Sequence, residues 1–214
     1  MTVQPNDAQI AETIKPYYSA PVTAHFCHQV RAYIDLLLHW NRRISLTTVT
    51  DPSQILRFHF GESLFAIDQV PIRHGRLADV GSGAGFPAVP IRMALEGVHV
   101  TLIESNRKKS AFLSEVVREL KLANVEVNSC RMEDVRNRES VFDFITVRAV
   151  LIDESVLAWA SSALNRDGKA VLWLVQEDST KVSLSTRFRW RPEAKIPGTE
   201  RRVVLVGTNT PASE

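Results

Sequence analysis

The sequence Leu77-Ala78-Asp79-Val80-Gly81-Ser82-Gly83-Ala84-Gly85-Phe86-Pro87 decides the fold of this 214-residue chain. It predicts a short buried strand, a glycine turn and a helix that begins near Pro87, because proline loses no hydrogen bond in a first helical turn. Glycine permits positive φ and lets a ligand approach the backbone closely. The free N–H groups at the start of a helix can also bind an anion. The stretch therefore predicts a ligand site, and a plain turn is the alternative.

The spacing of these glycines distinguishes between cofactors. The dinucleotide fingerprint is G-x-G-x-x-G/A, but its sixth position here is Phe86, whose ring would crowd close helix–strand packing. The pattern G-x-G-x-G after an acid, Asp79, is instead similar to the S-adenosylmethionine site of class I methyltransferases. We therefore expect S-adenosylmethionine as the cofactor, bound near Gly81, Gly83 and Gly85.

An acid also follows the next predicted strand. Glu104 stands directly after His99-Val100-Thr101-Leu102-Ile103, 23 residues after Gly81. Nucleoside-binding α/β folds place an acid at this position, where it accepts hydrogen bonds from the ribose hydroxyls. The sequence thus predicts that Glu104 binds the cofactor, while an acid that caps the following helix is the alternative.

Strands and helices alternate from Arg76 onward, which is typical of a parallel sheet with crossover helices. We expect an α/β fold of the Rossmann-like class I methyltransferase type, with a seven-stranded, mostly parallel sheet whose seventh strand is antiparallel. The further strands are predicted at 125–127, 142–147, 170–175 and 201–206, and the helices at 106–121 and 154–164.

The first 72 residues show helical periodicity instead. An apolar stripe recurs at three- and four-residue spacing, and Asp51-Pro52 is typical of a helix start. His59 lies on an apolar face and is interpreted as a hydrogen-bonded core histidine. We expect a helical cap over 1–72 and a methyltransferase domain over 73–214, packed as one globular unit. The stripe comprises Phe26, Val30, Tyr33, Ile34, Leu37 and Leu38.

The length allows one α/β domain with an additional segment, and the composition is typical of a cytoplasmic protein. The hydrophobic content is 44% and the formal net charge is +2, so charge alone does not identify a partner. Cys27 and Cys130 form neither a C-x-x-C motif nor a metal-ligand spacing, so we expect a reducing cytoplasm and no metal. The amino terminus lacks a signal-peptide core, and no apolar run approaches membrane-spanning length, so we expect no membrane partner.

Several motifs together resemble one family, the bacterial 16S rRNA guanine-N7 methyltransferases, first known as glucose-inhibited division protein B. The resemblance implies a class I fold with an amino-terminal helical cap, S-adenosylmethionine as the methyl donor, and the rRNA of the small ribosomal subunit as substrate. It is carried by Trp40-Asn41, Leu46-Thr47, Asp51-Pro52, His59, Ser63, residues 79–87, Pro90 and Arg148-Ala149.

The resemblance also implies roles for particular residues. It places the donor against Gly81 and Phe86, the adenine beside the backbone of Met132 and Glu133, and Arg148 beside the reacting end. Together with the pattern above, the expected donor-binding residues are Asp79, Gly81, Gly83, Gly85, Phe86, Glu104, Met132, Glu133 and Arg148.

The chain departs from the family pattern at four places. Leu174-Val175-Gln176 stands where family members have Lys-Gly after the fifth strand. The other departures are Ser45 for Asn, Phe58 for a basic residue, and Gly61-Glu62-Ser63 for a glycine-free Asp-Ser. Two alternatives therefore stay open. One is a methyltransferase of the same fold that acts on a small molecule or another RNA, and the other is a non-catalytic donor-binding module.

The predicted chemistry needs positioning rather than a base. Methyl transfer is an in-line displacement, and guanine N7 offers an unprotonated lone pair. The fourth predicted strand ends in Val147-Arg148-Ala149-Val150, not in the Asn/Asp-Pro-Pro-aromatic motif of exocyclic-amine methyltransferases. Arg148 could hold the donor carboxylate, hold a substrate phosphate, or stack on a base. Alternatively, Arg148 forms an ion pair with an acid such as Asp79. Such a pair would favour the non-catalytic donor-binding module.

RNA binding requires positive surface. A broad basic rim around the donor site would favour RNA, whereas a closed apolar pocket would favour a small molecule. In Arg187-Phe188-Arg189-Trp190-Arg191 the aromatic rings either stack on single-stranded RNA or pack into the core. The other candidate RNA contacts are Arg42, Arg43, Arg57, Arg107, Lys108, Lys109, Arg201 and Arg202.

Overall fold

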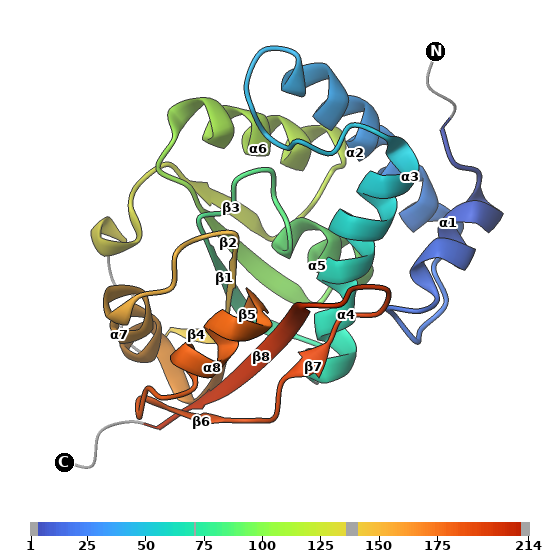
Figure 1. Ribbon diagram of the computed structural model, residues 1–214. Coiled ribbons are helices and arrows are strands. Elements are labelled where there is room, and N and C mark those ends of the chain that lie inside the picture. Colours follow the sequence, from blue (N-terminus) through green and yellow to red (C-terminus); the bar gives the residue numbers. More distant parts are fainter. Residues whose placement is uncertain (1–3, 71, 136–140, 211–214) are drawn as a thin grey trace.

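The computed structural model describes residues 4–70, 72–135 and 141–210. Its amino-terminal part is helical, as expected, and Figure 1 shows these helices grouped on one side of the molecule. Asp51 caps α3 by accepting a hydrogen bond from the Gln54 amide, and Pro52 opens that helix. The elements are α1 (Asp7–Ile14), α2 (Ala24–Asn41), α3 (Pro52–Ile55), the π-helix η1 (Leu56–Gly61) and α4 (Glu62–Gln69).

A single mixed sheet forms the centre of the fold, with strand order β3-β2-β1-β4-β5-β8-β6 and β7 paired with β8. β1 to β5 are parallel to one another, and β8 runs antiparallel to β5 as well as to its other partners, β6 and β7. The strands are β1 (Gly75–Val80), β2 (Val98–Ile103), β3 (Val125–Asn128), β4 (Phe142–Arg148), β5 (Leu164–Val175), β6 (Phe188–Trp190), β7 (Ala194–Lys195) and β8 (Arg202–Asn209).

The mostly parallel sheet is confirmed, but within the described residues it has eight strands rather than seven. The six strand ranges predicted from the sequence correspond to β1–β5 and β8, and the two strands without a predicted range, β6 and β7, are only three and two residues long. β5 also begins earlier than expected, at Leu164. Leu164 already pairs with Phe142, and an irregular register follows before Lys169 pairs with Phe144. Asp167 in this irregular segment has a positive φ of 63°, so regular pairing with β4 resumes only at Lys169.

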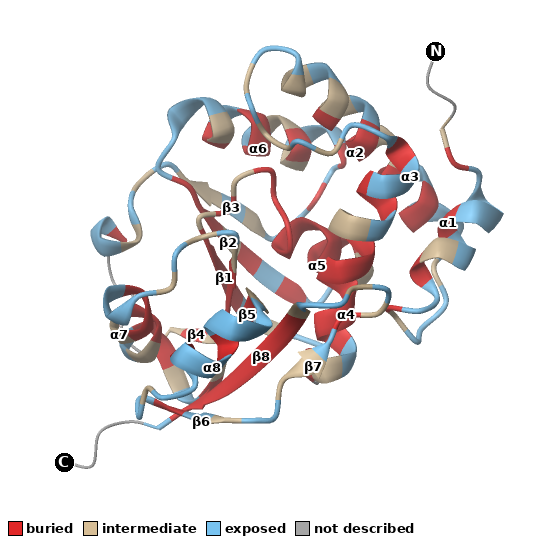
Figure 2. Ribbon diagram, viewed as in Figure 1, coloured by how far each residue is buried: buried red, intermediate tan, exposed pale blue. Residues whose placement is uncertain are grey.

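Helices cover both faces of this sheet, so its central strands are buried almost continuously, and successive residues point to opposite faces (Figure 2). On one face, Leu77 and Trp173 share a core with the cap, α5 and α6. On the other face, Ala78 and Leu172 pack with α7. The remaining helices are α5 (Ala88–Ala94), α6 (Arg107–Glu119), the 3₁₀ helix η2 (Met132–Asp134), α7 (Glu154–Ala163) and α8 (Gln176–Val182).

The cap is fixed to the sheet domain by hydrogen bonds as well as by apolar packing. Trp40 Nε1 donates to Glu115 Oε2 on α6 at 3.1 Å, and the Trp173 indole on β5 donates to the carbonyl oxygen of Glu62 at 2.8 Å. These contacts hold the cap against the carboxyl ends of the strands. Among the described residues, no helix combines the length and apolar character needed to span a bilayer.

Candidate functional site

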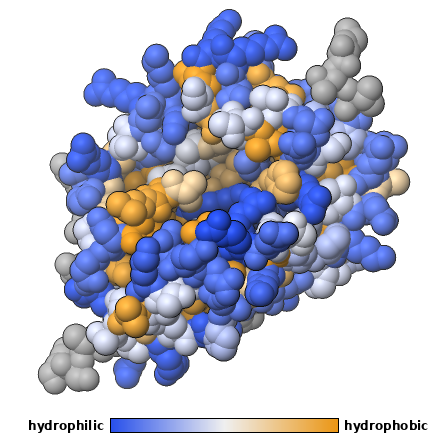
Figure 3. Space-filling view, viewed as in Figure 1, coloured by the Kyte–Doolittle hydropathy of each residue, from blue (hydrophilic) through white to orange (hydrophobic). Residues whose placement is uncertain are grey.

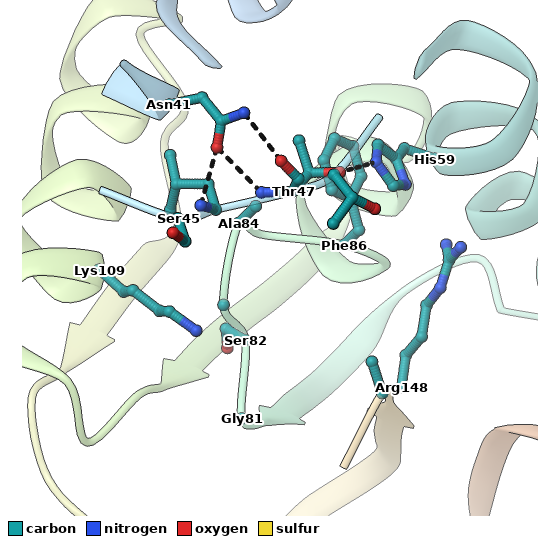
Figure 4. A pocket seen from close by; sticks show the side chains of 14 residues that line it. Asn41, Ser45, Thr47, His59, Gly81, Ser82, Ala84, Phe86, Lys109 and Arg148 are labelled. Atoms are coloured by element: carbon teal, nitrogen blue, oxygen red, sulfur yellow. Dashed lines mark hydrogen bonds between the residues drawn. The ribbon is translucent and has the colours of Figure 1, made fainter. Parts of the chain in front are cut away.

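A cavity of about 500 Å³ opens between the cap and the carboxyl ends of β1 and β4. Figure 4 shows Lys109 and Arg148 entering it from opposite sides of Ser82. Figure 3 shows a largely hydrophilic recess in the middle of this face, bordered on one side by an apolar patch. The lining residues are Asn41, Ser45, Leu46, Thr47, Thr48, His59, Gly81, Ser82, Gly83, Ala84, Phe86, Lys109, Arg148 and Ala149.

The three glycines of the turn all have positive φ, but they serve different purposes. At Gly83, φ is +57°, and an added Cβ would lie in nearly open space, with the Gly81 carbonyl oxygen nearest at 3.7 Å. A Cβ at Gly81 would instead clash with Val150, and one at Gly85 with the Tyr33 hydroxyl. Only Gly83 of the three therefore presents bare backbone to the cavity, which is the geometry that a closely bound ligand requires.

Glu104 is held against this turn. Its Oε2 accepts a hydrogen bond from the Gly83 amide at 2.8 Å, and its Oε1 accepts one from the Asn106 amide at 2.7 Å. The carboxylate thus connects the glycine turn to the start of α6. This contact agrees with the alternative in which Glu104 caps the helix that follows it. An ionised carboxylate has about four acceptor sites, so these two bonds leave capacity for ribose hydroxyls.

Asp79 is a buried carboxyl with spare acceptor capacity. Its side chain is 1% exposed, and Oδ1 accepts a hydrogen bond from the Thr146 hydroxyl at 2.6 Å. No donor among the described residues reaches Oδ2. Burial raises the pKa of Asp79 to about 7, because desolvation disfavours the charged form. Asp79 thus has one oxygen that could accept a further hydrogen bond, but it is not among the residues that line the cavity.

Replacing Asp79 with asparagine is expected to stabilise the protein above pH 7. The unfolded carboxyl ionises near pH 4, whereas the folded one holds its proton up to about pH 7. The wild type therefore loses stability as pH rises through that window, and the neutral amide does not. Melting temperatures at pH 8 and at successively lower pH should show an advantage of Asp79→Asn that shrinks towards pH 4. The exposed Asp167→Asn is the control, and a variant less stable than wild type at pH 8 would contradict the prediction.

Arg148 extends from the end of β4 into the cavity lining. Its Nη2 donates to the Phe58 carbonyl oxygen at 2.7 Å and pairs with Glu62 Oε2 at 2.9 Å. Its Nη1 is buried, and no acceptor among the described residues reaches it. Arg148 is thus ion-paired, which was the alternative to a ligand contact, and its partner is Glu62 rather than Asp79. The pair occupies one terminal nitrogen and leaves the other for a ligand.

An aromatic cluster surrounds the sixth position of the turn. The Phe86 ring stacks on Tyr33 at 5.2 Å and on His59 at 4.7 Å between centroids. The ring therefore packs into the cap and does not crowd the packing of α5 on β1. His59 Nε2 lies 2.8 Å from the Thr47 hydroxyl, and desolvation lowers the pKa of His59 to about 4. The interpretation of His59 as a hydrogen-bonded histidine is confirmed, but the residue also lines the cavity.

The loop after α2 forms a wall of the cavity that sequence reasoning did not assign. Asn41 Oδ1 accepts hydrogen bonds from the amides of Leu46 and Thr47 at 2.8 and 3.0 Å, and Asn41 Nδ2 donates to the Thr47 carbonyl at 2.8 Å. The sequence pointed to this loop only through Asn41 and Leu46-Thr47, which are among the residues that carry the family resemblance. The lining residues that were not predicted as donor-binding residues are Asn41, Ser45, Leu46, Thr47, Thr48, His59, Ser82, Ala84, Lys109 and Ala149.

The expected adenine residues lie elsewhere. Met132 and Glu133 form η2 after β3, and neither is among the residues that line this cavity. The cavity thus accounts for the part of the site at the ends of β1 and β4. The adenine contact stays a proposal.

The basic residues fall into two groups. Lys109 lines the cavity, and its neighbours Arg107 and Lys108 are exposed in the first turn of α6. By contrast, three arginines are engaged in ion pairs: Arg187 with Glu154, Arg201 with Glu177, and Arg202 with Glu62. The positive rim is therefore concentrated at α6 and at the exposed Arg42 and Arg43 after α2.

The aromatic residues of β6 belong to the core. Phe188 is buried, and Trp190 packs beside it with 5.1 Å between ring centroids. The Trp190 indole donates to the Ser185 carbonyl at 2.9 Å. Core packing is therefore confirmed for this pair, and RNA stacking is not supported.

S-adenosylhomocysteine is expected to stabilise the protein against heat more than NADH does at equal concentration. Close helix–strand packing at a dinucleotide site requires a small residue where Phe86 stands. The Phe86 ring instead fills the space between Tyr33 and His59. Thermal shift measurements with both ligands check this expectation, and equal shifts would refute it.

Comparison with known proteins agrees with this geometry. The family model described as rRNA small subunit methyltransferase G matches residues 26–187. A ribosomal RNA small subunit methyltransferase G of Desulfitobacterium hafniense is 38% identical over 139 residues, which are 64% of this chain and 57% of the relative. That of Pseudomonas paraeruginosa is 38% identical over 177 residues, which are 80% of each chain. The alignments with the first three relatives span 53% to 67% of those proteins' lengths.

Solved structures show the fold. A SAM-dependent methyltransferase from Aquifex aeolicus superposes with a TM-score of 0.63 at 16% identity, over 75% of this chain and 94% of that one. A ribosomal protein L11 methylase from Lactobacillus delbrueckii gives a TM-score of 0.59 at 14% identity, over 72% and 79%. The class I methyltransferase fold is thus confirmed. With the family match over residues 26–187, the chain belongs to the rRNA small subunit methyltransferase G family.

Proposed function

We propose that this protein transfers a methyl group from S-adenosylmethionine to N7 of a guanine in 16S rRNA of the small ribosomal subunit, in the cytoplasm. The family match supports the reaction and the substrate class. The observation that carries the proposal for this chain is the cavity between glycine turn and cap. Its lining contains the bare backbone of Gly83 and Arg148, whose Nη1 has no acceptor among the described residues.

The donor is proposed to bind along the carboxyl ends of β1, β2 and β3. Gly83 allows its close approach, Gly81 and Gly85 shape the turn that binds it, Asp79 receives its ammonium group, and Glu104 receives its ribose hydroxyls. Phe86 and the backbone of Met132 and Glu133 complete the site, with the two latter beside the adenine. When bound, S-adenosylmethionine supplies an electrophilic methyl group.

The protein's residues are proposed to position the acceptor without removing a proton. Guanine N7 carries none at neutral pH, so alignment of the two reactants is the main requirement. His59 is neutral above its pKa of about 4, and the Thr47 hydroxyl already lies at hydrogen-bond distance from its Nε2. The Nη1 group of Arg148 and the positive rim at Lys109 orient the RNA.

The alternatives are less well supported. A small-molecule enzyme is expected to enclose its substrate in an apolar pocket, but this cavity has hydroxyl, amide and cationic side chains in its lining. A non-catalytic module is expected to sequester Arg148, but the ion pair with Glu62 leaves Nη1 unused.

The proposal is tested with purified protein, methyl-labelled S-adenosylmethionine and small subunits from a strain that lacks the gene. We expect the label in 7-methylguanosine after digestion of the rRNA. Label in another nucleoside would refute the N7 assignment, and no label in rRNA would refute the substrate class. Mature small subunits from a strain with the gene are the control, since their target is already methylated.

A further inference from the structure

A buried carboxylate connects the cap to two strands of the sheet. Glu62, the first residue of α4, is only 1% exposed. Its Oε2 lies 2.9 Å from Arg148 Nη2 on β4, and its Oε1 lies 2.8 Å from Arg202 Nη1 on β8. Burial of a carboxylate is costly unless its charge is compensated. The two arginines oppose this cost, while burial still raises the pKa of Glu62 above its ordinary value.

The π-helix before Glu62 holds the same arginine from a second direction. The Phe58 carbonyl oxygen in η1 accepts a hydrogen bond from Arg148 Nη2 at 2.7 Å. The Phe58 ring lies 5.1 Å from the Arg202 guanidinium carbon, within cation–π range. Wide helical turns of this kind are frequent at functional sites. Glu62 and Phe58 together therefore fix Nη2, which determines the direction in which the rest of the guanidinium faces.

The consequence lies at Nη1. A guanidinium is planar and rigid. Contacts that fix the position of Nη2 and the orientation of the plane therefore also fix the position of Nη1. Nη1 is buried with no acceptor among the described residues, and Arg148 lines the cavity. The protein thus holds the guanidinium through Nη2, while Nη1 is a buried donor without an acceptor among the described residues.

We infer that Glu62 is a positioning residue, which acts on methyl transfer only through Arg148 by fixing its guanidinium at the cavity. This inference rests on the proposed function for its catalytic consequence. Glutamine at position 62 has one acceptor oxygen for two arginines, and its NH₂ group meets the other guanidinium as a second donor. It therefore removes the fixed geometry while keeping the size of the side chain.

A double-mutant cycle tests whether the two residues act as a unit. Glu62→Gln is expected to lower kcat/KM for small subunits about tenfold or more, and Glu62→Gln with Arg148→Gln to be no worse than Arg148→Gln alone. Glu62→Asp is expected to recover most of the loss, because it restores the charge. The control is Glu115→Gln, which also removes a carboxylate that joins the cap to the sheet domain but lies on α6. Additive losses, or an equal loss in the control, would overturn the inference.

A second measurement does not depend on activity. In arginine side-chain NMR spectra, the Arg148 guanidinium of the wild type is expected to rotate slowly, and in Glu62→Gln to rotate fast, with the signal assigned by its loss in Arg148→Gln. A wild-type protein that labels no rRNA would refute the proposed function, while this spectral change would still support the role of Glu62. Identical Arg148 signals in wild type and Glu62→Gln would overturn that role.

Discussion

Substitution of Gly83 by valine is expected to abolish measurable binding of S-adenosylhomocysteine, a loss of roughly 100-fold or more, equivalent to about 2.7 kcal/mol. The space that an added Cβ would enter is open, since its nearest neighbour is the Gly81 carbonyl at 3.7 Å. A branched side chain would therefore occupy the ligand's space rather than protein interior. Its φ of +57° adds strain, because β-branched residues avoid this region.

Isothermal titration checks this expectation, with Gly198→Val as the matched control. Gly198 also has a positive φ, of +68°, but it lies between β7 and β8, outside the cavity lining. Both variants carry similar backbone strain, so only a difference in affinity reports on the cavity. Undiminished affinity in Gly83→Val would remove Gly83 from the donor site.

The neighbouring glycines provide a further contrast. At Gly81 and Gly85 a side chain would meet Val150 and Tyr33, which belong to the protein itself. Substitutions there act first on folding, whereas the Gly83 substitution acts first on binding. The sequence pattern could not separate these roles, because all three glycines satisfy the same spacing.

The arrangement of the proposed donor residues could be predicted from the sequence because it is local. Asp79 lies at the end of β1, the glycine turn follows it, and Glu104 follows β2, the neighbouring parallel strand. The positions of these residues in the sequence therefore predict that they lie close together in the fold. The fold class could be predicted for the same reason, since alternating strands and helices determine a parallel sheet.

The rest of the site could not be predicted, because it depends on distant pairs. Arg148 and Glu62 are 86 positions apart, and their ion pair forms only when α4 packs over the end of β4. Periodicity places Glu62 on a helix but does not select its partner. The hydrogen bonds that fold Asn41 onto Leu46 and Thr47 are local, but nothing in the residues alone indicates that this loop faces the glycine turn.

The substitution Arg148→Gln is expected to lower turnover on small subunits roughly 100-fold, while the affinity for S-adenosylhomocysteine changes less than about fivefold. The fold should tolerate the change, because Glu62 keeps its ion pair with Arg202 at 2.8 Å. What disappears is the charged Nη1 group at the cavity, which has no other function among the described residues. If that group orients the RNA, its loss affects the reaction and not the donor.

Single-turnover kinetics with saturating donor, together with isothermal titration, separate the two roles of Arg148. Arg187→Gln is the matched control, because Arg187 also pairs with a glutamate, Glu154, but lies on an exposed surface where ion pairs contribute little. Arg148→Lys keeps the charge but loses the planar fork, and it should therefore remain well below wild type. Equal losses of turnover and donor affinity in Arg148→Gln would assign the arginine to the donor carboxylate instead. A variant with normal turnover would show that the protein positions its acceptor without Arg148, and would return that role to the positive rim at Lys109.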